Sequence, residues 1–154
     1  MPTSQPIEEL LFQALARHQT KLDENQIEAR LGTYQGCPFL KLDKANWHNR
    51  GEVKIPGEIF FSIWMDENDR MNYNIHAFKL RHLTGYNLQG RKFAADFRDR
   101  LQSTKQNWPN ISVEFGPLTL MQGWVDDENQ IDELITEFIS SHHIIDMLLE
   151  ENKK

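Results

Sequence analysis

The feature of this sequence that most constrains its fold is a pair of apolar runs joined by a short polar stretch. The runs cover residues 58–65 and 71–80, and the five residues between them, 66–70, are all polar. Two such runs flanking a polar turn predict a β-hairpin with a longer loop. If Met65 pairs with Met71, the alternation of side chains along each strand creates one shared apolar face, which we expect to pack in the core. Its members are Ile59, Phe61, Ile63, Met65, Met71, Tyr73, Ile75 and Ala77.

The rest of the chain predicts helices and strands around this hairpin. Helical spacing predicts a first helix from about Ile7 and a second, short one around residues 27–31 that ends at Gly32. Residues 33–57 are predicted to form a loop around a short strand at 39–42. A helix is expected over 90–102, strands over 111–115 and 118–125, and a last helix that Asp126 or Asp127 caps. The segment 140–143, Ser-Ser-His-His, interrupts the apolar stripe of that last helix.

These elements predict a fold class. Their order is α-β-β-β-α-β-β-α, which is typical of an α+β protein with a largely antiparallel sheet packed against helices. We expect about five strands and a single domain over residues 1–154, since a chain of this length can bury one core. No internal repeat and no linker divides the sequence.

The opposite face of the hairpin has an unusual composition. On the same pairing it combines two large aromatic rings with amides, a hydroxyl and an imidazole, the side chains of Phe60, Ser62, Trp64, Asn72, Asn74 and His76. An open sheet face of this kind binds ligands by stacking on the rings and by hydrogen bonds to the amides. The other interpretation is that a helix or loop covers Phe60 and Trp64. We therefore treat the six residues as a candidate face for a ligand or a partner.

Charge is strongly separated along this acidic chain, whose net charge is −6. Residues 79–105 carry seven cations and two aspartates, a net +5, whereas residues 126–151 carry nine carboxylates and no Lys or Arg. Arg98 and Arg100 can pair locally with Asp96 or Asp99. Four of the five remaining cations form a candidate patch for an anion or a partner: Lys79, Arg81, Arg91 and Lys92.

Three interpretations of this patch remain open. The basic helix can pair with the acidic last helix of the same chain, which is the common structural use of a charged helix face. It can bind nucleic acid or a phosphate ligand, although an isoelectric point of about 5.5 opposes nonspecific nucleic-acid binding. It can also bind a protein.

No residue pattern indicates a metal site, a cofactor or a catalytic centre. His142 and His143 are adjacent, so their side chains diverge on a helix, and His76 and His82 would lie about 20 Å apart on a strand. The common nucleophile and phosphate-binding motifs are absent. We expect the single Cys37 to be a small packed residue at a turn. The predictions are therefore no catalytic residue, no metal and no cofactor.

The expected function is a non-enzymatic protein-interaction module. The protein is expected in the cytoplasm, because the sequence has one cysteine, no basic and apolar leader, and no apolar run near the roughly 20 residues that span a membrane. Its expected partner is another protein or a second copy of itself, and we expect no membrane association. Two other interpretations stay open: a nucleic-acid or phosphate-ligand binding protein that uses residues 79–92, and a hydrolase or transferase with a site around His76.

Overall fold

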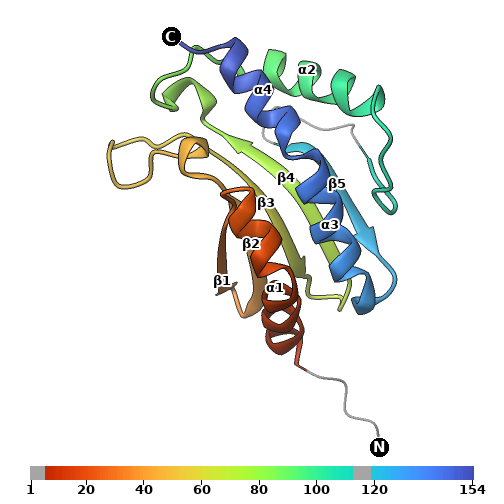
Figure 1. Ribbon diagram of the computed structural model, residues 1–154. Helices are drawn as coiled ribbons and strands as arrows, with labels where there is room; N and C mark the ends of the chain where they lie inside the picture. The colour runs from red at the N-terminus through yellow and green to blue at the C-terminus, as the bar shows by residue number, and fades with distance from the viewer. Residues whose placement is uncertain (1–5, 113–118) are drawn as a thin grey trace, which may run out of the picture.

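The fold is a five-stranded antiparallel sheet with helices, as the α+β prediction stated (Figure 1). A computed structural model of the chain describes residues 6–112 and 119–154. The strands follow one another across the sheet in chain order. Their bounds are β1 (Glu28–Tyr34), β2 (Cys37–Asp43), β3 (Glu58–Met65), β4 (Met71–Phe78) and β5 (Thr119–Val125).

The predicted hairpin is confirmed with its register. Strands β3 and β4 pair antiparallel, and Met65 lies opposite Met71. The predicted core face is buried except at Met65, which is partly buried, and Phe61 and Tyr73 are fully buried. Gly123 lies opposite Tyr73 on β5, where a Cβ atom would stand 2.6 Å from the Tyr73 Cζ atom. This close approach explains why a glycine stands in the middle of β5.

Helices cover one face of the sheet. Figure 1 shows α1 (Ile7–Glu24), α3 (Ile131–Ser141) and α4 (His143–Glu151) on the same side of the strands. Phe138 of α3 stacks on Phe61 with ring centroids 4.8 Å apart, so the core lies between the sheet and these helices. The fourth helix, α2 (Gly90–Gln102), packs against α4 and β5. None of the helices in the described part of the chain is long and apolar enough to cross a membrane.

The short helix predicted at 27–31 is wrong, because this segment is strand β1. Gln26 has a positive φ of 59°, which ends the turn after α1 and reverses the chain. Leu31 then lies opposite Leu40 of β2 in an antiparallel ladder. The spacing of Ile27 and Leu31 suits a helix turn as well as a strand, and the pairing with β2 decides between them. The first hairpin of the sheet is therefore β1–β2, not a helix followed by a loop.

Three other predictions concern the segment before β5, the last helix and its cap. Residues 113–115 of the strand predicted at 111–115, Val113 and Phe115 among them, lie outside the described residues. Within the described part, Ser112 forms a bridge with Gln122. The last helix was predicted as one element with an interrupted apolar stripe, but the structure divides it into α3, which ends at Ser141, and α4, which begins at His143. Asp127 caps the short 3-10 turn Glu128–Gln130 before α3 by accepting a hydrogen bond from the Asn129 backbone N–H.

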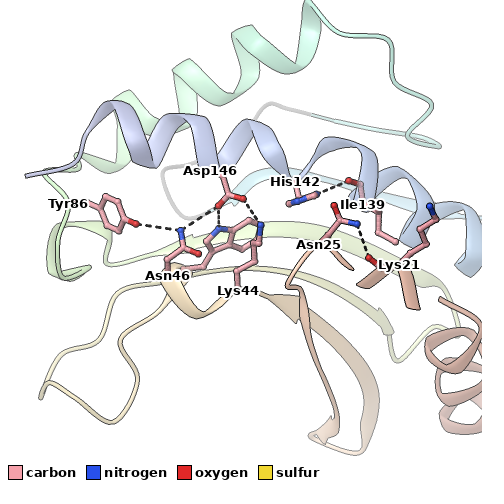
Figure 2. Close-up of polar contacts among 9 residues, drawn as sticks. Lys21, Asn25, Lys44, Asn46, Tyr86, Ile139, His142 and Asp146 are labelled. Atoms are coloured by element: carbon pink, nitrogen blue, oxygen red, sulfur yellow. Dashed lines mark hydrogen bonds and ion pairs between the residues drawn. The ribbon is translucent and has the colours of Figure 1, made fainter. Parts of the chain in front are cut away.

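Asp146 of α4 joins the last helix to the segment that follows β2 (Figure 2). Its carboxylate accepts hydrogen bonds from Lys44 Nζ at 2.6 Å and from the Trp47 indole N–H at 2.8 Å. Burial opposes ionisation of Asp146, but these two donors outweigh it and hold the pKa of the carboxyl below its usual value. The contact fixes the 3-10 turn Ala45–Trp47 against α4 and so places the start of the loop 44–57.

The basic helix and the acidic last helix do meet. Arg100 of α2 forms an ion pair with Glu151 of α4 at 2.5 Å, rather than with its neighbours Asp96 and Asp99. Arg98 donates hydrogen bonds to the backbone oxygens of Thr119 and Leu120 on β5. These two arginines therefore hold α2 to the rest of the fold.

Candidate functional site

The six side chains of the predicted binding face lie together on the side of the sheet opposite α1, α3 and α4. The register aligns them in rows that continue onto β2. Phe39 lies opposite Trp64, and Lys41 lies opposite Ser62. Asn72, Asn74 and His76 extend these rows onto β4. We call this side of the sheet the outer face.

A surface pocket of about 680 Å³ opens on the outer face. Five of the six predicted residues line it. Asn72 does not, because its amide donates instead to Asp66 Oδ2 and to the Arg70 backbone oxygen. The full lining is Thr33, Tyr34, Cys37, Phe39, Lys41, Phe60, Ser62, Trp64, Asn74 and His76. This outer pocket therefore combines aromatic walls with a few polar groups, as small-ligand and side-chain pockets do.

Lys41 is the one cationic side chain of the pocket lining, and no carboxylate lines it. The Lys41 ammonium stands 4.4 Å from the centroid of the Phe60 ring and 5.0 Å from that of Phe39. Among the described residues it has no hydrogen bond and no ion pair. Burial lowers the pKa of Lys41, and the nearby Arg30 guanidinium lowers it further. An anionic group entering the pocket would find an ammonium that two aromatic rings hold in place.

His76 lies at the other side of the pocket among aromatic rings. Its ring centroid is 5.2 Å from that of Phe60 and 5.9 Å from that of Phe78. Burial lowers the pKa of His76, so the neutral imidazole is favoured. The nearby Ser62 hydroxyl donates a 2.6 Å hydrogen bond to Asn74 Oδ1. Because the serine proton points to an amide oxygen, which is not a base, Ser62 lacks the activation that a nucleophile needs.

Strand β1 is the edge of the sheet next to this pocket. It pairs with β2 on one side only in the described part of the chain. A second groove of about 470 Å³ lies between β1 and the first half of α1 and includes Phe12 and Leu31. Phe12, Leu31 and Tyr34 are large apolar side chains that are 61%, 41% and 69% exposed. The edge strand therefore has one apolar groove on its helix side and the outer pocket on its other side.

A polar cluster around the buried Asp43 lies at the other end of the β1–β2 ladder. Glu28 of β1 pairs in register with Asp43 of β2, and His48 follows in the loop after β2. One donor atom from each of these three residues lies within 4.8 Å of the other two. On the far side of Asp43, both Arg30 and Arg50 contact the Oδ2 atom, at 3.0 and 3.1 Å.

The four cations of the predicted basic patch do not share one surface pocket. Lys79 and Arg81 line a groove with Ile55 and Gly90, whereas Lys92 lines a different one with Asn87 and Asn152. Lys92 also forms an ion pair with Asp96 at 2.6 Å, and the Lys79 ammonium lies 5.3 Å from the Phe78 ring centroid. Phosphate binding by this patch would therefore draw on separated side chains.

Sequence reasoning missed the contribution of β1 and β2. Phe39 and Lys41 belong to the outer face because β2 pairs with β3, and Tyr34 lies beside it because residues 28–34 form a strand. The available signal was the alternation in the stretch 37–43, where Cys37, Phe39 and Lys41 alternate with Pro38, Leu40 and Leu42. Extending the predicted strand 39–42 by two residues toward the N-terminus would have predicted that Cys37, Phe39 and Lys41 share one face.

Comparison with known proteins adds no further constraint on the function. No protein-family model, curated protein or solved structure matches this chain.

Proposed function

We propose that this protein is a non-enzymatic interaction module that binds an extended segment of a partner protein along the edge strand β1. The observation that carries the proposal is the position of edge strand β1 between the groove at Phe12 and Leu31, on one side of the sheet, and the outer pocket on the other side. Unpaired backbone groups on an edge strand are a template for an added strand. We further propose that the protein acts in the cytoplasm, with Cys37 as a reduced thiol.

The geometry of strand addition matches the two recesses. Side chains of an added strand alternate between the two faces of the sheet. Those on one face would reach the groove at Phe12 and Leu31, and those on the other would reach the outer pocket at Tyr34 and Phe39. The two grooves therefore suit a single extended segment better than two unrelated ligands.

Charge indicates which side chains the segment carries. Lys41 is an ammonium without a carboxylate partner among the described residues. A carboxylate on the outer side of the segment would pair with Lys41 in a partly buried setting, where charge-assisted hydrogen bonds are strong. We therefore propose a segment that alternates apolar residues with at least one Asp or Glu.

The same face gives a weaker basis for the hydrolase or transferase interpretation. Ser62, Asn74 and His76 do share the outer pocket, which that interpretation requires. However, the Ser62 hydroxyl is bonded to the Asn74 amide oxygen, so no base is in position to activate it. The geometry supports recognition at this face better than catalysis.

The direct test is selection of linear peptides from a random display library on the purified protein. We expect the selected peptides to alternate apolar and acidic residues and to shift the backbone amide resonances of β1 on binding. Replacing Leu31 by Lys should weaken the binding of the selected peptides at least about tenfold, because a buried unpaired ammonium would replace an apolar contact. Met147, which is 50% exposed on α4, provides a matched control, and Met147→Lys should leave binding unchanged.

Two outcomes would overturn the proposal. The first is the absence of selected peptides, or peptides whose resonance shifts map away from β1. The second is a homodimer in light scattering that Leu31→Lys converts to a monomer, since β1 would then be an interface between two copies of this chain.

A further inference from the structure

We propose that Glu28, Asp43 and His48 form a binding site for a divalent transition-metal ion, for which zinc is the best chemical fit. The three residues lie at the end of the β1–β2 ladder, away from the Leu31 and Tyr34 end where a partner segment is proposed to bind. The site thus adds a second function to this sheet and does not depend on the first.

The buried polar atoms of the cluster point to a missing partner. Asp43 is 1% exposed, and its Oδ1 atom has no hydrogen-bond partner among the described residues. Both ring nitrogens of His48 are likewise buried without a partner in that part of the chain. Leaving a buried polar atom unpaired costs about 1–3 kcal/mol for each group, so native proteins rarely tolerate several side by side.

The spacing of the donor atoms suits a small cation. A point equidistant from three atoms 4.8 Å apart lies about 2.8 Å from each, and zinc bonds to imidazole nitrogen and carboxylate oxygen measure about 2.0–2.2 Å. Each donor would therefore need to move inward by less than about 1 Å. An ion at this point would bond to Asp43 Oδ1, to Glu28 and to one His48 nitrogen, while the other nitrogen keeps its proton.

The chemistry of the donors selects the class of metal. One imidazole with two carboxylates suits zinc and related transition ions better than calcium or magnesium, which prefer oxygen ligands alone. Three protein ligands leave a fourth position of a tetrahedral zinc ion free for water or another ligand. Glu28 is exposed, so this position can open to solvent.

The two arginines beside Asp43 set the expected strength of binding. Arg30 and Arg50 contact the other carboxylate oxygen of Asp43, and their charges repel a second cation nearby. For one arginine and a divalent ion at a separation of about 6 Å in a water-like dielectric, Coulomb's law gives a repulsion equivalent to up to about a tenfold change in affinity. Removal of Arg30 should therefore tighten metal binding, whereas a purely structural ion-pair cluster would give no metal binding to tighten.

The experiment is titration calorimetry of the chelator-treated full chain with zinc ions alone, and then with magnesium ions alone. We expect one zinc ion to bind per chain and magnesium to bind far more weakly. Replacing His48 by Gln or Glu28 by Gln should weaken zinc binding by at least about 100-fold, since even changes outside the ligand set cost roughly 10–100-fold. Arg30→Met should tighten it up to about tenfold.

The controls separate loss of the proposed zinc site from misfolding and from zinc binding at surface histidines. Glu28 is exposed, so Glu28→Gln should fold even if a change at the buried Asp43 would not, and circular dichroism checks each variant. His143 is an exposed histidine on α4 and provides the matched control for His48. The proposal fails if the folded wild-type chain binds no stoichiometric zinc, or if His143→Gln removes the binding that His48→Gln retains.

Discussion

The helix-side face of the sheet is mainly apolar and buried, whereas the outer face carries charged groups with atoms that lack a partner among the described residues. On the helix side, Phe61 and Tyr73 are fully buried, and the Tyr73 hydroxyl donates a 2.6 Å hydrogen bond to the Pro109 backbone oxygen. On the outer face, Lys41 has aromatic contacts but no anionic partner in the described part of the chain, and Asp43 has an unpaired oxygen. On β2, Leu40 and Leu42 are buried in the core while Lys41 between them lines the outer pocket, so neighbouring residues of one strand belong to different faces.

This difference separates the face that stabilises the fold from the face at which we propose binding. Buried apolar area and paired polar groups stabilise the folded state, whereas a charged group left half-buried without a partner destabilises it. Perturbed, unpaired charges are common at functional sites, so the Lys41 ammonium on the outer face, unpaired within residues 6–112 and 119–154, and the apolar packing on the helix side point to different roles. Substitutions on the two faces should therefore separate folding from binding.

The largest effect should come from Phe61→Ala on the helix side. Phe61 is fully buried and stacks on Phe138 of α3, so truncation leaves a cavity in the core. We expect the free energy of unfolding to fall by about 3–5 kcal/mol. Urea denaturation followed by circular dichroism measures this change.

Trp64→Ala is the matched change on the outer face of the same strand. Trp64 is partly exposed and lines the outer pocket, so its truncation should cost less than about half of the Phe61 effect. Equal losses in the free energy of unfolding for the two variants would mean that the outer face packs like a second core. The proposed difference between the two faces would then be wrong.

A medium effect is expected for Asp146→Asn, which tests the polar contact that joins α4 to the helix-side core. The variant keeps the size of the side chain but removes the negative charge to which Lys44 and the Trp47 indole donate hydrogen bonds. We expect a loss of about 1–3 kcal/mol in the free energy of unfolding at neutral pH. Urea denaturation at a series of pH values measures it.

The sign of the pH dependence follows from the lowered pKa of Asp146. A carboxyl whose pKa is lower in the folded state contributes stability above its ordinary value of 3.8, and this contribution disappears as the pH falls through the folded-state pKa. The difference between wild type and Asp146→Asn should thus be largest above pH 3.8 and shrink below it. A difference that stays constant with pH would contradict this account of Asp146.

Local patterns predicted the helix-side face well. The alternation in 58–65 and 71–78 placed Ile59, Phe61, Tyr73 and Ile75 on one face, because a strand that is buried on one side reveals its register in the sequence. The stripe of Phe93, Phe97 and Leu101 likewise predicted the helix 90–102, and all three residues are buried. These signals are strong because burial selects apolar residues at fixed spacing.

The outer face was predicted only in part. Its six residues on β3 and β4 followed from the hairpin, but Lys41 and the edge strand β1 depended on a ladder between segments whose own patterns are ambiguous. The Glu28, Asp43 and His48 cluster was missed for the same reason, since the expectation of no metal site compared histidines only with one another. Residues 15 positions apart in the chain meet there through the antiparallel register, which local periodicity does not encode.

The smallest effect on stability, with a large effect on binding, is expected for Lys41→Met. The change removes a half-buried ammonium and keeps a long side chain against Phe39 and Phe60, so the lost cation–π contact and the relieved burial of charge should nearly cancel. We expect the free energy of unfolding at pH 7 to stay within about 1 kcal/mol of the wild-type value. Affinity for the selected acidic peptides should nevertheless fall at least about tenfold, because the carboxylate loses its charged partner.

The pH dependence separates this account from a simple packing effect. Because the folded state lowers the pKa of Lys41 below its ordinary value of 10.5, the unfolded chain binds more protons between the two values, and wild-type stability should rise relative to Lys41→Met as the pH increases through that interval. Paired urea denaturations at pH 7 and near pH 10.5 measure the difference. If peptide affinity is unchanged in Lys41→Met, the ammonium is not the anchor for the partner's carboxylate, and the outer face recognises its ligand through the aromatic rings alone.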